Sequence, residues 1–124
     1  DTPEVFDKTL DFCNKAGIEI CNFTALTPFP GTKLYERLKK EDRIMTYDWD
    51  KYDIINPVIT PKGMTLPQLR KGICHCYDKY YSFKSIISRF VKYFPRMGLK
   101  KSIIILQVNI DMRKIRKKLM ASAI

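Results

Sequence analysis

The sequence predicts an α/β remnant, a helix–strand–helix in the order found in a β/α barrel, followed by an all-α C-terminal extension. Apolar residues recur at helical spacing from Val5 to Ala16, and Gly17 stops that pattern. A largely apolar run over 18–26 follows, as expected of a strand covered on both faces. From Thr65 onward only helical patterns recur. We therefore expect a mostly helical chain divided into a barrel end, 1–62, and a basic helical extension, 63–124.

The first helix has clear end signals. Thr2 suits an N-cap and Pro3 the first helical position, where no hydrogen-bond donor is lost. Only Gly17 separates this helix from the apolar run over 18–26. A helix followed so closely by a buried strand indicates one α-to-β step of a parallel sheet.

The loop over 27–32 is the candidate cofactor-binding site. Its two prolines restrict the backbone, its glycine permits a turn, and its last threonine can cap a helix over 33–40. Backbone N–H groups at such a helix start favour a phosphate or a carboxylate. A purely structural strand-to-helix turn needs the same residue types, and spacing alone favours that reading. The candidate residues are Thr27, Pro28, Pro30, Gly31 and Thr32.

The stretch over 44–62 is irregular in pattern. Trp49 and Tyr52 are expected to anchor it, Asp48 to cap a turn, and 56–60 to form a short strand. The acidic residues near Asp48 do not by themselves indicate acid–base catalysis, because such pairs are defined by distance in space.

The second half is predicted to be helical throughout. Thr65 and Gln68 form a capping box for a helix over 66–81. Ser82 can cap the next helix, which continues to about residue 93. Pro95 and Gly98 then break the pattern, and a last helix is expected over 99–120.

Charge is distributed unevenly. The net charge is +10, but residues 1–62 carry 9 basic and 11 acidic side chains, a net of −2, whereas residues 63–124 carry 14 and 2, a net of +12. We expect the second half to face an anionic partner or to gain solubility from this charge. There is no signal peptide pattern and no apolar run long enough to span a bilayer, so we expect a cytoplasmic protein with reduced thiols. The opening on a helix cap suggests a piece of something larger.

Metal binding and nucleophilic catalysis are not favoured. Cys74, His75 and Cys76 are consecutive, so on a helix their side chains point in different directions. Cys13 and Cys21 lie in different predicted elements. His75 is the one histidine, and it is expected on a helix surface. No catalytic residue and no metal ligand is therefore assigned.

The last predicted helix carries an apolar stripe beside a cluster of basic residues. The stripe comprises Ile105, Val108, Met112, Ile115 and Leu119, and the cluster comprises Arg113, Lys114, Arg116, Lys117 and Lys118. Docking on the rest of a parent enzyme or a partner helix is favoured. Peripheral contact of residues 99–120 with an anionic membrane remains open. Nucleic-acid binding is disfavoured, because no nucleic-acid-reading motif accompanies the charge.

Taken in order, the motifs resemble the C-terminal portion of cobalamin-binding-type radical S-adenosylmethionine enzymes. The resemblance covers roughly residues 1–90, and most members have glycine where this chain has Asp42. The segments that carry it are 1–4, 9–10, 26–32, 34–35, 43–44, 48–49, 52–53, 61–65, 80–82, 85–86 and Arg89.

The resemblance implies a parent enzyme that uses S-adenosylmethionine, a four-iron four-sulfur cluster and, as a further cofactor, cobalamin. It implies that the cluster is held by a Cys-x-x-x-Cys-x-x-Cys motif, whose spacing no cysteines of this chain have. We therefore expect no cofactor bound by this chain alone and no activity from it. Its expected partner is the remainder of the parent enzyme or a homologous chain. The alternative is a non-catalytic module whose basic helices bind an anionic membrane surface or a partner protein.

Overall fold

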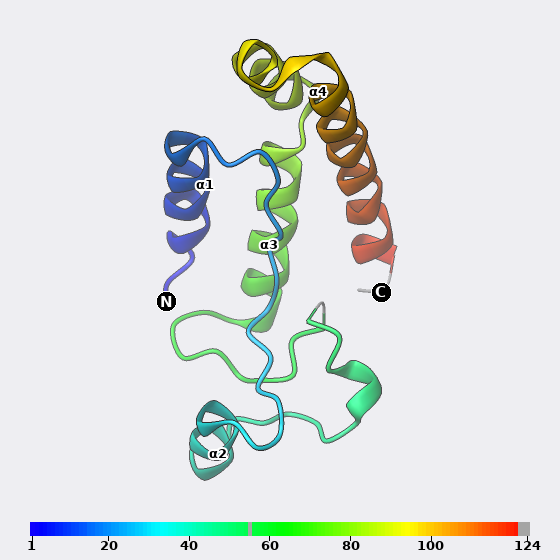
Figure 1. The fold of residues 1–124 in the computed structure, drawn as a ribbon. Coiled ribbons are helices and arrows are strands. Elements are labelled where there is room, and N and C mark those ends of the chain that lie inside the picture. Colours follow the sequence, from blue (N-terminus) through cyan, green and yellow to red (C-terminus); the bar gives the residue numbers. More distant parts are fainter. Residues whose placement is uncertain (55, 122–124) are drawn as a thin grey trace. The chain divides into compact units, whose positions relative to one another are not determined.

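The protein is described here from a computed structural model, which covers residues 1–54 and 56–121, with side chains described up to Ile115. Within these residues, four α-helices and one short 3₁₀ helix follow one another along the chain (Figure 1). Their bounds are α1 Val5–Ala16, α2 Lys33–Lys40, η1 Trp49–Lys51, α3 Leu66–Tyr80 and α4 Phe83–Ala121. The prediction of a mostly helical chain is confirmed.

The chain forms two compact units. The first comprises Asp1–Val5 and Thr24–Ile73, and the second comprises Phe6–Phe23 and Cys74–Ile124. A small cluster of Leu38, Tyr52, Val58 and Ile59 is the core of the first unit. In the second unit the buried residues include three tyrosines around the end of α3, namely Tyr77, Tyr80 and Tyr81.

The predicted strand over 18–26 is not formed. The segment is extended, but none of the described residues belongs to a β-ladder beyond one isolated bridge elsewhere. A strand requires a neighbour that exchanges backbone hydrogen bonds with it. Residues 18–23 form several of those backbone hydrogen bonds with side chains of their own unit instead. The strand that the apolar composition predicted is therefore wrong.

Helix α1 ends where the sequence predicts. Gly17 has a positive φ of 69°, the Gly17 N–H donates to the Asn14 carbonyl, and the Ile18 N–H donates to the Cys13 carbonyl. These two bonds define a Schellman motif. At the other end the helix begins at Val5, whose N–H donates to the Thr2 carbonyl, so the helix starts slightly later than Pro3.

Helix α2 has the predicted N-terminal cap and a left-handed stop at its other end. The Tyr35 N–H donates to the Thr32 hydroxyl at 3.2 Å, which is an N-cap bond. At the C-terminal end the Asp42 and Arg43 N–H groups donate to the Lys39 and Leu38 carbonyls, and Asp42 takes a φ of 51°. Asp42 therefore occupies the left-handed position that usually belongs to glycine.

Replacing this residue with glycine should stabilise the protein. A non-glycine residue pays roughly 1 kcal/mol in the left-handed region, and Asp somewhat less than most because its side chain bonds locally. We expect Asp42→Gly to raise the free energy of unfolding by about 0.5 kcal/mol, the gain being limited by the extra freedom of glycine in the unfolded chain. Urea unfolding checks this. Asp42→Ala should be destabilising, and the opposite order would contradict the left-handed cap.

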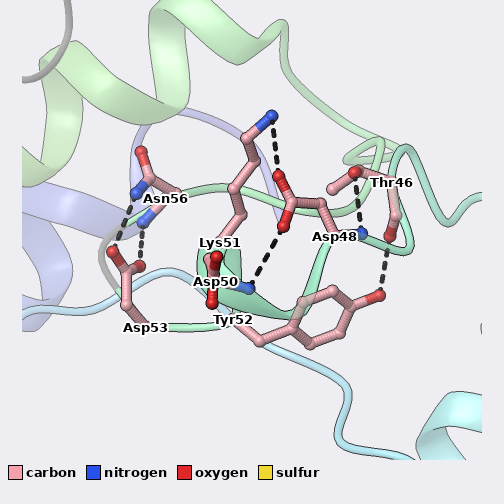
Figure 2. A network of polar contacts seen from close by, with 7 residues as sticks. All are labelled: Thr46, Asp48, Asp50, Lys51, Tyr52, Asp53 and Asn56. Carbon is pink, nitrogen blue, oxygen red and sulfur yellow. Dashed lines mark hydrogen bonds and ion pairs between the residues drawn. The ribbon is translucent and has the colours of Figure 1, made fainter.

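The segment after α2 is held by a local polar network (Figure 2). The Asp48 carboxylate accepts from the Asp50 N–H and caps η1, as predicted. The Tyr52 hydroxyl donates to the Thr46 carbonyl at 2.8 Å, and Tyr52 is buried, as expected of an anchor. Trp49 is not an anchor, because 54% of it is exposed. The predicted strand over 56–60 is reduced to one antiparallel bridge between Ile44 and Ile59.

The two long helices follow the capping signals. The Gln68 side chain accepts from the Thr65 N–H at 2.7 Å, and the Thr65 hydroxyl accepts from the Gln68 N–H, so the capping box is confirmed. The Ser82 hydroxyl accepts from the Ser85 N–H and caps α4. Helix α4 contains Pro95 and is interrupted at Gly98, where φ is 73° and ψ is 167°. It is therefore two helical segments, as predicted, joined at a kink.

Candidate functional site

The loop over 27–32 is a compact turn in the first unit. The Thr32 N–H and hydroxyl both donate to the Phe29 carbonyl, at 3.2 and 2.7 Å, and Gly31 has a φ of 80°. The Thr27 hydroxyl donates to the Ala25 carbonyl at 3.2 Å. These bonds fix the loop relative to the start of α2.

Burial divides the predicted site residues into two groups. Thr27 and Pro28 are buried and hold the loop in place. Pro30, Gly31 and Thr32 are exposed, and a Cβ added at Gly31 would meet no atom within 4 Å. The Thr32 cap accepts from the Tyr35 N–H, and the N–H groups of α2 before Tyr35 have no acceptor within the helix, so this tip can offer donors to an anionic group. The geometry suits both the ligand-binding and the structural reading of the loop.

The acidic residues around η1 are engaged in turn formation. The Asp53 carboxylate accepts from the N–H and the side-chain amide of Asn56, both at 2.8 Å, and Asp48 also pairs with Lys51 (Figure 2). Among the described residues no three His, Cys, Asp or Glu side chains are grouped as metal ligands. The network therefore explains local structure and does not define a catalytic centre.

The thiols and the histidine lie in ordinary packing positions. Cys13, Cys21 and Cys76 are buried, and burial raises the pKa of Cys13 to about 11 and that of Cys76 to about 12. The thiols of Cys13 and Cys76 therefore remain protonated at neutral pH and are poor nucleophiles. His75 is partly exposed on α3, as predicted, and its Nε2 lies 3.0 Å from an Asp7 carboxylate oxygen.

Three tyrosine hydroxyls bond the backbone of the extended segment 18–23. The Tyr81 hydroxyl accepts from the Cys21 N–H at 2.9 Å and donates to the Cys21 carbonyl. The Tyr77 hydroxyl accepts from the Phe23 N–H, and the Tyr80 hydroxyl donates to the Ile18 carbonyl. These side chains supply bonds that a neighbouring strand supplies in a sheet. Sequence reasoning missed this role, although the spacing of 77, 80 and 81 on one helical face was visible.

These tyrosines should make the protein sensitive to high pH. Burial raises the pKa of Tyr81 to about 12 and also raises the pKa of Tyr77 and of Tyr80. Unfolded tyrosines ionise near pH 10, whereas the folded ones keep their protons, so the free energy of unfolding should fall as pH rises from about 10 toward 12. Urea midpoints across this range check the prediction. In the Tyr81→Phe variant the free energy of unfolding should fall less steeply with pH than in the wild type. Parallel pH curves for the two proteins would contradict the prediction.

Arg89 is a buried cation that the sequence analysis assigned no role. Arg89 is 8% exposed, its Nη1 donates to the Ser85 hydroxyl and its Nη2 donates to the Asn109 side-chain carbonyl, both at 2.7 Å. Its guanidinium lies 3.9 Å from the centre of the Tyr80 ring, a cation–π contact. The Asn109 amide in turn donates to the Glu19 carbonyl at 3.3 Å. Arg89 and Asn109 together therefore connect the two segments of α4 to the segment over 18–23.

Comparison with known families identifies the class of protein. Residues 32–122, more than half of the chain, match the family model described as a domain of unknown function, DUF4070. The chain belongs to this family. No solved structure matches the chain.

The relatives with assigned names are methyltransferases and cyclases. The chain is 35% identical over 81 residues to an uncharacterized methyltransferase of Pyrococcus horikoshii, covering 65% of this chain and 18% of the relative. It is 35% identical over 89 residues to the bacteriochlorophyllide d C-12(1)-methyltransferase of Chlorobaculum tepidum, covering 72% and 19%. It is 27% identical over 86 residues to the anaerobic magnesium-protoporphyrin IX monomethyl ester cyclase of Cereibacter sphaeroides, covering 69% and 14%.

These matches support the resemblance that the sequence predicted, to the C-terminal portion of radical S-adenosylmethionine enzymes of the methyltransferase and cyclase kind. The chain spans less than a fifth of the length of each of these three relatives. None of the helices in the described part of the chain combines the length and apolar character that crossing a bilayer requires.

Proposed function

We propose that this chain is the C-terminal fragment of a cobalamin-binding-type radical S-adenosylmethionine, iron–sulfur enzyme, and that it contributes a barrel-mouth loop and a helical tail but not the cluster. The observation that carries the proposal is the match to 18% and 19% of the length of two methyltransferases. The cysteine spacing of the chain supports the second part, because Cys13, Cys21, Cys74 and Cys76 do not form a Cys-x-x-x-Cys-x-x-Cys motif.

The loop over 27–32 is the part of the fragment proposed to face the bound cofactor. Its buried residues Thr27 and Pro28 would keep its shape, and its exposed residues Pro30, Gly31 and Thr32 would lie against the ligand. In the parent, the bound S-adenosylmethionine and cluster would supply the radical chemistry. The loop would contribute backbone donors and a fixed wall that excludes water.

Reconstitution tests this proposal. The 124-residue chain, treated anaerobically with iron and sulfide, should bind no iron–sulfur cluster and should release no 5′-deoxyadenosine from S-adenosylmethionine. The parent, expressed from the reading frame that contains this chain, should do both. Gly31→Val in the parent should weaken S-adenosylmethionine binding, with Lys100→Ala, at an exposed position of α4, as a control away from the loop. A cluster on the isolated chain, or a parent reading frame without the three-cysteine motif, would refute the proposal.

A second candidate rests on an exposed apolar stripe of α4 other than the one predicted over 105–119, whose Leu119 lies outside the residues with described side chains. Phe83, Ile87 and Val91 lie on one helical face and are 61%, 59% and 65% exposed. We propose that the rest of the parent covers this stripe. A membrane surface is the competing occupant, and co-sedimentation with anionic vesicles at low and high salt separates the two. Sedimentation of the isolated chain that is lost in a Phe83→Ser/Ile87→Ser variant would favour the membrane.

A further inference from the structure

A polar groove opens in the second unit beside the first turns of α4. Its cavity volume is about 370 Å³, and it lies entirely within residues of that unit. This volume falls near the lower end of the range of small-molecule sites, about 300–1,000 Å³. The groove is lined by Asn14, Ser82, Lys84, Ser85, Ser88, Arg89, Lys92 and Tyr93.

The charge of the groove has one sign. Lys84 and Lys92 stand two turns apart on one side of α4, with Ser88 between them, and Arg89 stands on the adjoining face. None of the lining residues that the structure describes carries a carboxylate. Cations gathered around a concave surface focus the potential and attract anions.

Arg89 is an independent observation at the groove, a buried cation whose hydrogen-bond partners are neutral. Its side chain is more than nine-tenths buried, and its Nε has no hydrogen-bond partner among the described atoms. Its two Nη atoms donate to a neutral hydroxyl and a neutral amide, and the described residues give it no ion pair. A buried charge without a counter-ion is costly. An anion in the groove that Arg89 lines would offset this cost.

The start of α4 adds to the same field. Ser82 caps the helix and lines the groove, and Lys84 and Ser85 belong to the first helical turn. The positive end of the helix dipole therefore lies at the groove and favours a negative group there. The hydroxyl of Ser88 and the amide of Asn14 supply neutral donors at the wall.

We propose that this groove binds a phosphate group. Three cations and several neutral donors match a tetrahedral dianion with several acceptor oxygens better than they match a single carboxylate. The remaining volume leaves room for a small organic part. This site is separate from the loop over 27–32, and the inference does not depend on the proposed parent enzyme.

Calorimetric titration of the full chain with inorganic phosphate, at fixed ionic strength, tests the proposal. We expect saturable binding that weakens at least about tenfold in Lys84→Gln/Lys92→Gln, because two charge-assisted bonds are lost. Lys100→Gln/Lys101→Gln removes the same charge from exposed positions of α4 outside the groove and should bind as the wild type does. Circular dichroism verifies that both variants fold.

Two further arms identify the source of the phosphate. Glycerol phosphate represents a soluble ligand, and vesicles of phosphatidic acid with phosphatidylcholine represent a lipid headgroup. Binding of either that is lost in the groove variant but kept in the control supports the proposal and names the source. The proposal is overturned if neither inorganic phosphate nor these ligands bind saturably, or if the two double variants weaken binding equally, since that result would report net charge alone.

Discussion

Tyr81→Phe should lower the free energy of unfolding by about 3 kcal/mol, because it leaves two buried backbone groups unpaired at about 1–3 kcal/mol each. The Tyr81 hydroxyl both accepts from the Cys21 N–H and donates to the Cys21 carbonyl. Both residues are buried, Tyr81 to 1% and Cys21 to 8% exposure, so water does not readily replace the lost oxygen. The substitution preserves the ring and its packing against Tyr77 and Tyr80.

Urea unfolding followed by far-ultraviolet circular dichroism measures this loss. Tyr47→Phe is the matched control, since 55% of Tyr47 is exposed, and we expect it to change the free energy by less than about 0.5 kcal/mol. Amide hydrogen exchange adds a local test, because the Cys21 N–H should lose protection in Tyr81→Phe. If both variants unfold alike and this amide keeps its protection, the hydroxyl does not replace a strand neighbour.

Local signals in the sequence predicted most helix ends. Thr32, Thr65, Gln68 and Ser82 cap as expected because capping depends on bonds within a few residues. The helix stop at Gly17 follows from φ/ψ sterics, which are also local. Helix α1 begins at Val5 rather than at the predicted Pro3, because the Val5 N–H already donates to the Thr2 carbonyl in a turn before the helix.

Pairing between distant segments was not predictable in the same way. The apolar run over 18–26 specified an extended chain, but whether a strand forms depends on what lies beside it. Here Tyr77 and Tyr81 supply the partner atoms from more than fifty residues away. For the candidate site, spacing indicated the loop over 27–32 and its cap. It could not indicate that Thr27 and Pro28 are buried while Pro30 is exposed.

Asn109→Leu should also destabilise the protein by about 3 kcal/mol. The variant loses the hydrogen bond from the charged Arg89 guanidinium, a kind of bond that contributes about 1.5–3 kcal/mol, and it also loses the amide that donates to the Glu19 carbonyl. The Asn109 side chain accepts from Arg89 and donates to the Glu19 and Ile105 carbonyls, and it is 3% exposed. Leucine has a similar size, so the loss reports lost polar contacts rather than a cavity. In the variant, the buried Arg89 guanidinium would keep one of its two side-chain hydrogen bonds, the one to the Ser85 hydroxyl.

A double-mutant cycle with Arg89→Met separates this mechanism from simple packing loss. Removing the cation first removes the penalty for leaving it unpaired, so the double variant should be more stable than the sum of the single effects by more than about 1 kcal/mol. Gln107→Leu is the control, because Gln107 is exposed and its amide bonds only Asp111 among the described residues. Additive single effects would mean that Asn109 acts by its shape alone, and that the buried charge of Arg89 is balanced by groups other than Asn109.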